Sequence, residues 1–238
     1  MMTSVRSFVF SVLASCFLLA PTSGSSEEYK LLVMGDSLGQ GLGFGMARCL
    51  SRSNSFYVVN KGKTSSKLTN VRPVNWPDQA ETLSLGGFDA VVVQIGANDI
   101  MGIRSNGARV SFGSPQWHTE YKSRVIKITQ SFQKRSIPII WVGVPYPRKA
   151  AWRYPYSLIN DAIKAGAASV GVPFVSIWDD FLKDGQYSTY GEGVDGRQTL
   201  LRADDGVHFS MAGYIKVASL VLPHLVKSLK IKSLECEK

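Results

Sequence analysis

Residues 31–38, Leu-Leu-Val-Met-Gly-Asp-Ser-Leu, decide the expected fold. The apolar run Leu31–Met34 is continuous rather than alternating, as in strands that are buried on both faces of a parallel sheet. It leads directly into Gly35, Asp36 and Ser37, and a helix is expected to follow. Open α/β sheets carry their functional sites at the carboxyl ends of their strands. The stretch therefore predicts a buried strand with a site serine at its end.

Four further apolar runs have the same character, and helical patterns lie between them. These runs are Phe56–Val59, Ala90–Ile95, Ile137–Val144 and Pro173–Trp178. Amphipathic helices are expected over residues 116–134, 156–168 and 211–230, with Ser210 as the N-cap of the last. Strands that alternate with helices predict a three-layer α/β/α fold. Residues 182–203 lack periodicity and are expected to form a long loop near the functional edge of the sheet.

The composition of the 238 residues excludes several classes of protein. Hydrophobic residues make up 45% and charged residues 19%, which is not the composition of a disordered chain. Three cysteines cannot form a disulfide framework, and no CxxC pair or HExxH motif indicates a metal site. The 27 Lys and Arg residues exceed the 18 Asp and Glu residues, for a net charge of +9, but they form no nucleic-acid-binding signature. Nucleic acid is therefore not an expected partner.

Two stretches that contain glycine do not match the cofactor-binding motifs that they resemble. The glycines between residues 39 and 45 fall at every second position, so the dinucleotide pattern GxGxxG is not met. Residues 62–64, Gly-Lys-Thr, resemble the end of a P-loop, but Tyr57 stands where the first glycine is required. No metal or cofactor is expected.

Residues 1–24 have the pattern of a secretory signal peptide. Arg6 precedes a 13-residue, mainly apolar stretch, Phe8–Ala20, and small polar residues follow. The run is shorter than the roughly 20 residues of a membrane span, so no transmembrane segment is expected after processing. Residues 13–16, Leu-Ala-Ser-Cys, resemble a lipoprotein box, but apolar residues continue beyond Cys16 and favour soluble export. We expect residues 25–238 to form one exported domain, secreted or in a bacterial periplasm, with the charge lowered to +8 by the loss of Arg6.

Export leaves two cysteines in an oxidising compartment. Cys49 and Cys236 can form a disulfide that tethers the C-terminal tail. Alternatively, Cys49 is a small buried hydrophobic residue and Cys236 is a free thiol. The sequence favours neither.

Three short motifs bring together the groups of a nucleophilic enzyme. They are Gly35-Asp36-Ser37-Leu38, Gly96-Ala97-Asn98-Asp99 and Asp205-Gly206-Val207-His208. Asp205 precedes His208 by three residues, so it can hold Nδ1–H and leave Nε2 facing a nucleophile. We therefore expect Ser37 to be the nucleophile, His208 the general base and Asp205 the orienting acid. Asn98, at the end of a buried strand, is expected to bind the oxyanion.

Other polar side chains have expected roles outside the chemistry. Asp36 is expected to hold the nucleophile loop by hydrogen bonds, and Asp99 to brace the loop that follows Asn98. His118 is expected to be exposed at a helix start, and His224 to be a core or surface residue of the last helix.

These motifs resemble those of the SGNH, or GDSL-type, hydrolase superfamily, and the resemblance covers residues 30–230. It implies a flavodoxin-like α/β/α sandwich with a mainly five-stranded parallel sheet, and a Ser–His–Asp triad that acts on esters. The sequence is also similar to a branch of exported bacterial members of unknown function. That narrower similarity rests on residues 75–77, 141–145 and 201–210.

The oxyanion hole departs from the family pattern at one position. Members usually have a glycine after the second strand, whose N–H is a donor. Here that position falls at Ser66-Lys67, and Gly62 comes early. Because every residue except proline has an N–H, Lys67 or Ser66 can donate. The expected oxyanion hole consists of Ser37, Asn98 and Lys67.

These observations predict an exported serine esterase that hydrolyses O-acyl, in particular O-acetyl, esters on carbohydrates or cell-envelope polymers, with a small-molecule or polysaccharide ester as substrate. Four aromatic residues in loops can line a carbohydrate site or simply pack: Trp76, Tyr146, Trp152 and Tyr190. The positive charge fits attraction to anionic envelope polymers. Two alternatives remain, an acyltransferase that uses the same triad and a binding protein with a relic triad. The sequence does not indicate an oligomeric state.

Overall fold

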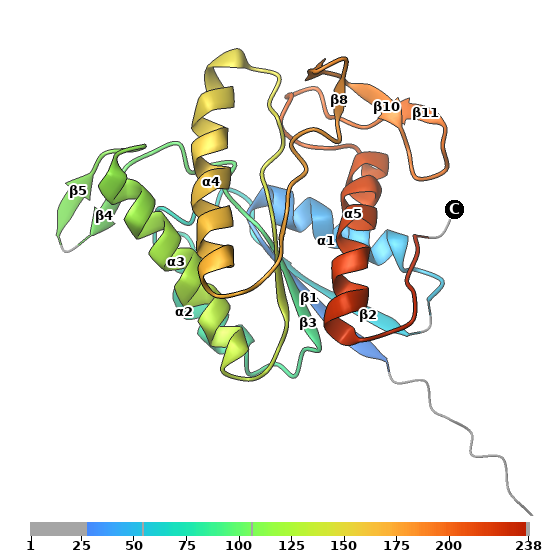
Figure 1. Cartoon of the computed structure of the whole chain (residues 1–238), viewed down its shortest axis with the longest axis horizontal. Helices are drawn as coiled ribbons and strands as arrows, with labels where there is room; N and C mark the ends of the chain where they lie inside the picture. The colour runs from blue at the N-terminus through green and yellow to red at the C-terminus, as the bar shows by residue number, and fades with distance from the viewer. Residues whose placement is uncertain (1–27, 54, 106, 237–238) are drawn as a thin grey trace, which may run out of the picture.

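The computed structural model describes residues 28–53, 55–105 and 107–236, and it shows a parallel sheet between two layers of helices (Figure 1). The strands of this sheet are β1 (Tyr29–Gly35), β2 (Phe56–Gly62), β3 (Ala90–Gln94), β6 (Ile139–Val142) and β7 (Phe174–Val175). They pair in parallel in the order β2-β1-β3-β6-β7. This is the flavodoxin-like order, and the five expected strands and the expected fold are confirmed. The expected signal peptide lies outside the described residues.

Five α-helices cover the two faces of the sheet in the part of the chain that the structure describes. They are α1 (Ser37–Cys49), α2 (Trp76–Leu83), α3 (Pro115–Gln133), α4 (Arg153–Ser169) and α5 (Met211–Leu229), and a 3-10 turn, η1 (Ala150–Trp152), precedes α4. α1 packs against α5, and α3 lies between α2 and α4 (Figure 1). Ser210 caps α5 as expected, because its hydroxyl accepts from the Gly213 N–H. The short α2 was not predicted, since eight residues hold little periodic signal.

The expectation of a plain loop over residues 182–203 is wrong. This segment contains two antiparallel pairs, β8 (Leu182–Lys183) with β9 (Gln186–Tyr187), and β10 (Tyr190–Glu192) with β11 (Gln198–Leu200). A third hairpin joins β4 (Ile103–Ser105) and β5 (Ala108–Val110). Strands of two or three residues are too short to show alternation in a sequence. Within the described residues, no helix combines the length and the apolar character that crossing a membrane requires.

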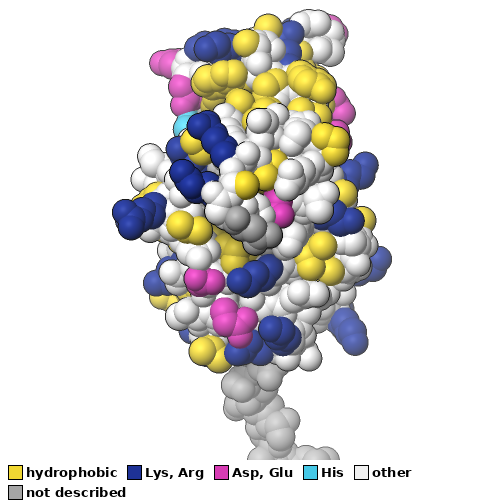
Figure 2. Space-filling model, turned by 90° about the vertical axis from the view of Figure 1, so that its left-hand side faces the viewer, with side chains coloured by type: hydrophobic (Ala, Val, Ile, Leu, Met, Phe, Trp, Pro, Cys, Tyr) yellow, Lys and Arg dark blue, Asp and Glu magenta, His cyan; other side chains and the backbone are white. Residues whose placement is uncertain are grey.

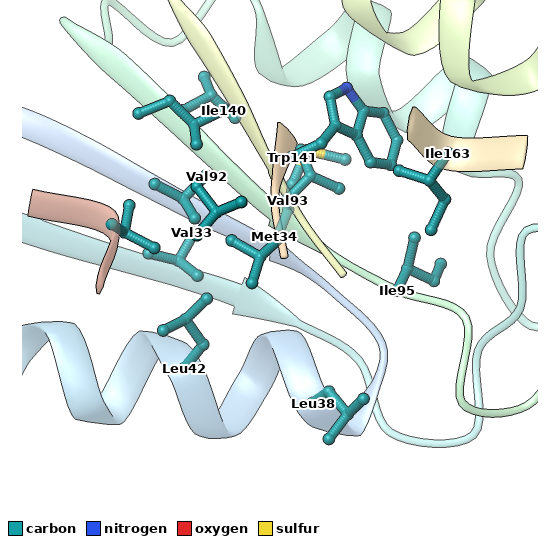
Figure 3. Packing of buried hydrophobic residues seen from close by; sticks show 14 of the residues in the cluster. Val33, Met34, Leu38, Leu42, Val92, Val93, Ile95, Ile140, Trp141 and Ile163 are labelled. Carbon is teal, nitrogen blue, oxygen red and sulfur yellow. The ribbon is translucent and has the colours of Figure 1, made fainter. Parts of the chain in front are cut away.

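The hydrophobic core forms around the central strands. Val33 on β1 and Val92 on β3 are completely buried, and Figure 3 shows such side chains packing with Leu38 and Leu42 of α1. The edge strand β2 differs from the expectation of burial on both faces, because Tyr57 is 57% exposed. An edge position leaves part of a strand outside the helical layers.

The glycines of α1 serve helix packing. A Cβ on Gly41 would lie 2.0 Å from the ring of Tyr214 on α5, and a Cβ on Gly45 would lie 2.6 Å from the Tyr214 backbone. Side chains at these positions would push the two helices apart. The close contact between α1 and α5 therefore explains two glycines of the run that fails as a nucleotide motif, while Gly39 and Gly43 lie against the sheet.

Cys49 and Cys236 form a disulfide, which decides between the two alternatives left open by the sequence. Cys49 is the last residue of α1, and Cys236 lies in the tail after α5. The bond closes a loop over a sequence separation of 187 residues. The C-terminal tail is thus tied to the helix that begins with Ser37.

We expect Cys236→Ser to lower the free energy of unfolding by about 2–5 kcal/mol, because a cross-link of long span restricts the unfolded chain. Urea denaturation with and without a reductant measures the effect, and Ser233→Ala, an exposed tail position, is the control. The reductant should bring the wild type to the level of Cys236→Ser and leave that variant unchanged. Equal stability of both proteins without reductant would contradict the prediction.

Candidate active site

The turn between β1 and α1 places Ser37 at the carboxyl edge of the sheet. Gly35 has φ +139°, and a Cβ there would lie only 1.8 Å from the carbonyl oxygen of Gln94. Only glycine fits such a conformation and such an approach. Asp36 is the N-cap and Ser37 the first residue of α1. Ser37 therefore stands at a helix N-terminus, where the helix dipole favours negative charge.

The structure brings Ser37, His208 and Asp205 together in one hydrogen-bonded chain. His208 Nε2 lies 2.7 Å from Ser37 Oγ, although the two residues are 171 positions apart in the sequence. On the other side of the ring, Nδ1 lies 2.5 Å from Asp205 Oδ2. The second oxygen, Oδ1, accepts from the backbone N–H of Val207 at 2.8 Å and of His208 at 2.9 Å. The three predicted residues thus have the geometry of a Ser–His–Asp triad.

The ionisation of Asp205 follows from these contacts. Burial raises its pKa, but hydrogen bonds from the His208 ring and from the backbone N–H groups of Val207 and His208 outweigh that effect. The pKa is therefore held below its ordinary value. Asp205 remains a carboxylate throughout the pH range in which an imidazole titrates.

Asp36 joins the nucleophile turn to the loop that contains Asn98. Its carboxylate is fully buried and accepts from the backbone N–H of Leu38 at 2.9 Å and of Gly96 and Ala97 at 3.0 Å. Burial raises the pKa of Asp36 to about 6, against the opposing effect of these donors. The expected structural role of Asp36 is confirmed.

Asp99 joins the same loop to the segment after β2. Its buried carboxylate accepts from Leu68 N–H at 3.1 Å and from the Thr69 N–H and hydroxyl at 2.8 and 2.6 Å. The Tyr121 hydroxyl donates to it at 3.0 Å. Burial raises the pKa of Asp99 in spite of these donors. Asp99 braces this edge of the site, as expected.

The backbone of residues 66–67 distinguishes the two candidate donors. The Ser66 N–H donates to the carbonyl of Lys63 at 3.2 Å, so it is already used. The Ser66 carbonyl accepts from Asn98 Nδ2 at 3.2 Å, which places Asn98 against this loop. Among the described residues, the Lys67 N–H has no hydrogen-bond acceptor. The Ser66 hydroxyl accepts from Trp76 Nε1 at 3.1 Å and so fixes the loop.

Arg202 is a site residue that the sequence does not reveal. It is completely buried, and its guanidinium donates to the carbonyls of Tyr146, Val207 and Gly206 at 3.0, 3.1 and 3.3 Å. Burial lowers its pKa to about 10. Two of these carbonyls belong to the His208 loop and one to the segment after β6, so Arg202 links the two segments. In the sequence, Arg202 is one basic residue among many, because tertiary structure alone brings these carbonyls together.

The four loop aromatics divide between packing and exposure. Trp76 is only 2% exposed and belongs to the core, so it does not line a substrate site. Tyr146 and Trp152 are half-buried, and Trp152 stacks on Tyr156. Tyr190 is 55% exposed on β10. Packing is therefore the role of Trp76, while the other three remain open to solvent in part.

The two remaining histidines lie away from the triad. His118 is half-buried with its ring edge-on to Trp117, so the expectation that it is exposed is wrong. Its place in the first turn of α3, beside a buried tryptophan, accounts for the difference. His224 lies on α5, where burial and the charge of Lys227 lower its pKa.

The strand order and the Ser–His–Asp chain at the carboxyl edge place the protein in the SGNH hydrolase superfamily. Within it, the chain belongs to the family described as "Protein of unknown function (DUF459)", which it matches over residues 30–224. No curated protein matches the sequence.

Several solved structures share the fold. A catalytic mutant of Axe2, an acetylxylan esterase from Geobacillus stearothermophilus, is 17% identical, with a TM-score of 0.56 over 89% of this chain and 99% of that chain. TesA is 17% identical, with a TM-score of 0.58 over 84% of this chain and 99% of that one. A GDSL-like lipase from Bacteroides thetaiotaomicron is 14% identical, with a TM-score of 0.51 over 84% of this chain and 87% of that chain. Two of these neighbours are named as an acetylxylan esterase and a GDSL-like lipase, and the likeness to all three establishes the shared fold.

We expect Asp36→Asn to lower the free energy of unfolding at pH 7 by about 1–3 kcal/mol. An amide has only one acceptor oxygen, so at least one of the three N–H groups would face an N–H₂. Urea denaturation measures the loss, and Asp161→Asn, an exposed position on α4, is the matched control. If both variants lose equally little, the carboxylate does not hold the two loops together.

The pKa of Asp36 gives this comparison a pH dependence. The folded-state value of about 6 lies above the ordinary 3.8, so the folded protein binds this proton more tightly than the unfolded chain does. The contribution of Asp36 to stability therefore falls as the pH rises from about 4 to about 6. The stability advantage of the wild type over Asp36→Asn should be larger near pH 4.5 than near pH 7, and the reverse trend would contradict a raised pKa.

Proposed function

We propose that the protein is an exported serine esterase that hydrolyses O-acyl, in particular O-acetyl, esters on carbohydrates or cell-envelope polymers. The observation that carries this proposal is the chain from Ser37 Oγ through the His208 ring to Asp205, at the N-terminus of α1. The shared fold with an acetylxylan esterase supports the acetyl ester as substrate. The half-exposed aromatics Tyr146 and Trp152 suit a sugar ring.

The chemistry follows from the hydrogen bonds of the triad. His208 Nε2 takes the Ser37 proton while Oγ attacks the ester carbonyl, and Asp205 stabilises the imidazolium that forms. His208 then protonates the leaving alcohol, and the acyl group stays on Ser37. A water molecule, deprotonated by His208, attacks this acyl-enzyme; the acid leaves and the proton returns to Ser37.

The oxyanion hole that we propose has three donors. They are the Ser37 N–H at the start of α1, the Asn98 side-chain amide and the Lys67 N–H. Ser66 is excluded because its N–H is bonded to Lys63. Asn98 uses one amide hydrogen to contact the Ser66 carbonyl and keeps the other for substrate. Fixed donors of this kind stabilise the charge of the tetrahedral intermediate.

The proposal of export rests on two features. The first 24 residues have the pattern of a signal peptide. The disulfide between Cys49 and Cys236 is typical of proteins in oxidising compartments.

We expect Ser37→Ala to lower kcat on a chromogenic acetate by at least about 10³-fold, because the nucleophile is lost. A fluorophosphonate should label the wild type and fail to label Ser37→Ala, and Ser111→Ala, on an exposed turn, is the control. Full activity in Ser37→Ala would contradict the assignment, and an unreactive wild-type serine would favour the binding protein. Product analysis with and without a sugar acceptor distinguishes a hydrolase from an acyltransferase.

Two substitutions test the oxyanion hole. Asn98→Ala should lower kcat by about 10²–10³-fold, since one donor to the developing charge is lost. Lys67→Pro removes a backbone N–H that Lys67→Ala retains, so kcat should be about 10²-fold lower in the proline variant than in the alanine variant. Melting temperatures identify any variant that is unfolded. Equal activity of folded Lys67→Pro and Lys67→Ala would show that another group is the third donor.

A further inference from the structure

A basic cavity adjoins the loops that carry Asn98 and Lys67. It has a volume of about 280 Å³, and its lining includes Thr69, Met101, Gly102, Arg104, Arg109 and Arg124. Thr69 follows Lys67 by two residues, and Met101 follows Asn98 by three. The lining contains three arginines and no acidic residue. We call this space and its lining the arginine cavity.

Two of the arginines face each other across the β4–β5 hairpin. The register pairs Arg104 directly with Arg109, while the neighbouring pair, Ile103 and Val110, is buried. Like charges at directly opposed positions of an antiparallel pair destabilise it. In the described part of the chain neither arginine forms an ion pair with a carboxylate. An anion bound by both side chains would reduce this repulsion.

The side chain of Arg109 lies close to Gly102, which lines the cavity with it. Its Nε lies 3.3 Å from the point that a Cβ on Gly102 would occupy. The absence of a side chain at Gly102 thus leaves room for Arg109 to lie across the backbone. Arg109 therefore lies beside the segment that leads back to Asn98.

Arg124 links the β4–β5 hairpin to the segment that contains Lys67. Its guanidinium donates to the Leu68 carbonyl at 2.6 Å and to the Arg104 carbonyl at 3.2 Å. Glu120 and Asp99 are the acidic groups that act on Arg124, and neither lines the cavity. The positive charge of Arg124 is thereby held in place next to Leu68, the neighbour of Lys67.

The surface around this hairpin carries both kinds of charge. Figure 2 shows the face on which β4 and β5 lie, with Lys and Arg side chains spread over it and acidic side chains also near its centre. A second basic groove, lined by Arg48 and Arg197, lies at the other end of α1 from Ser37, roughly 16 Å away along the helix axis. There Asp195 is paired with Arg197 at 3.9 Å. The arginine cavity, in contrast, has no acidic residue in its lining.

We propose that the arginine cavity binds a carboxylate or phosphate group of the substrate, so that the esterase acts on acylated anionic glycans in preference to neutral ones. The substrate role rests on the proposed esterase function, whereas anion binding itself does not. Guanidinium groups bind both kinds of oxyanion in bidentate fashion. A glycan whose charged unit occupies the cavity would hold another unit of the same chain at Ser37.

Binding is measured by calorimetry at low ionic strength on the Ser37→Ala protein, which cannot turn over an ester. The probes are an oligogalacturonate, a glycerol phosphate oligomer and a neutral xylo-oligosaccharide of similar length. We expect an anionic oligomer to bind at least about 10-fold more tightly than the neutral one, and added salt to weaken it. The tighter of the two anionic probes identifies carboxylate or phosphate as the preferred group.

The double variant Arg104→Gln with Arg109→Gln should lose this preference by about 10-fold or more. The matched control, Arg48→Gln with Arg197→Gln, removes the same charge at the remote groove and should retain it. If the control loses the preference and the test variant keeps it, the remote groove is the anion site and the proposal is wrong. Equal binding of anionic and neutral oligomers to the parent protein would also overturn it.

Kinetics separate this proposal from the proposed function. On the wild-type background, the ratio of kcat/KM for acetylated oligogalacturonate to that for acetylated xylo-oligosaccharide should fall in the Arg104/Arg109 double variant. If no ester is hydrolysed but arginine-dependent binding persists, the esterase function fails and the anion site stands. If both esters are hydrolysed with a ratio that the double variant leaves unchanged, the esterase stands and the anion site fails as a determinant of substrate.

Discussion

The buried carboxylate of Asp36 is the constraint on which the site depends. It accepts N–H groups from its own turn and from the loop of Asn98, and so fixes the carboxyl ends of β1 and β3 relative to each other. Asp99 repeats this arrangement between the Asn98 loop and the segment after β2. Both carboxylates bear the cost of burial, which raises their pKa values. Backbone N–H groups at the strand ends, which would otherwise lack acceptors, offset part of that cost.

Beside the His208 loop, the buried charge is positive: it is the guanidinium of Arg202. Arg202 is buried among carbonyl groups of the Tyr146 and His208 segments, as Asp36 is buried among N–H groups. Backbone dipoles thus stabilise a buried cation beside the His208 loop. They also stabilise buried carboxylates beside the Ser37 turn and the Asn98 loop. Each ion binds two segments, so groups outside the Ser–His–Asp chain fix the backbone on both sides of the contact between Ser37 Oγ and the His208 ring.

The sequence predicts the parts of this arrangement that are local in the chain. Continuous apolar runs reveal the central strands, and the three-residue spacing of Asp205 and His208 reveals their hydrogen bond. The roles of Arg202 and the pairing of Arg104 with Arg109 depend on tertiary contacts or on strands of three residues, so no periodic signal exists for them. The sequence leaves the disulfide as one of two alternatives, because the proximity of Cys49 and Cys236 follows only from the packing of α1 against α5.

The nucleophile helix shows how the scaffold and the site are joined. α1 is held at its start by the Asp36 cap, along its length by glycine contacts with Tyr214, and at its end by the disulfide. α5, which supplies Tyr214, begins three residues after His208. Ser37 therefore begins one helix and His208 lies just before another, and the two helices are in direct contact. A displacement of either helix would change the Ser37–His208 distance, so close packing at Gly41 and Gly45 has a direct consequence for the geometry of the triad.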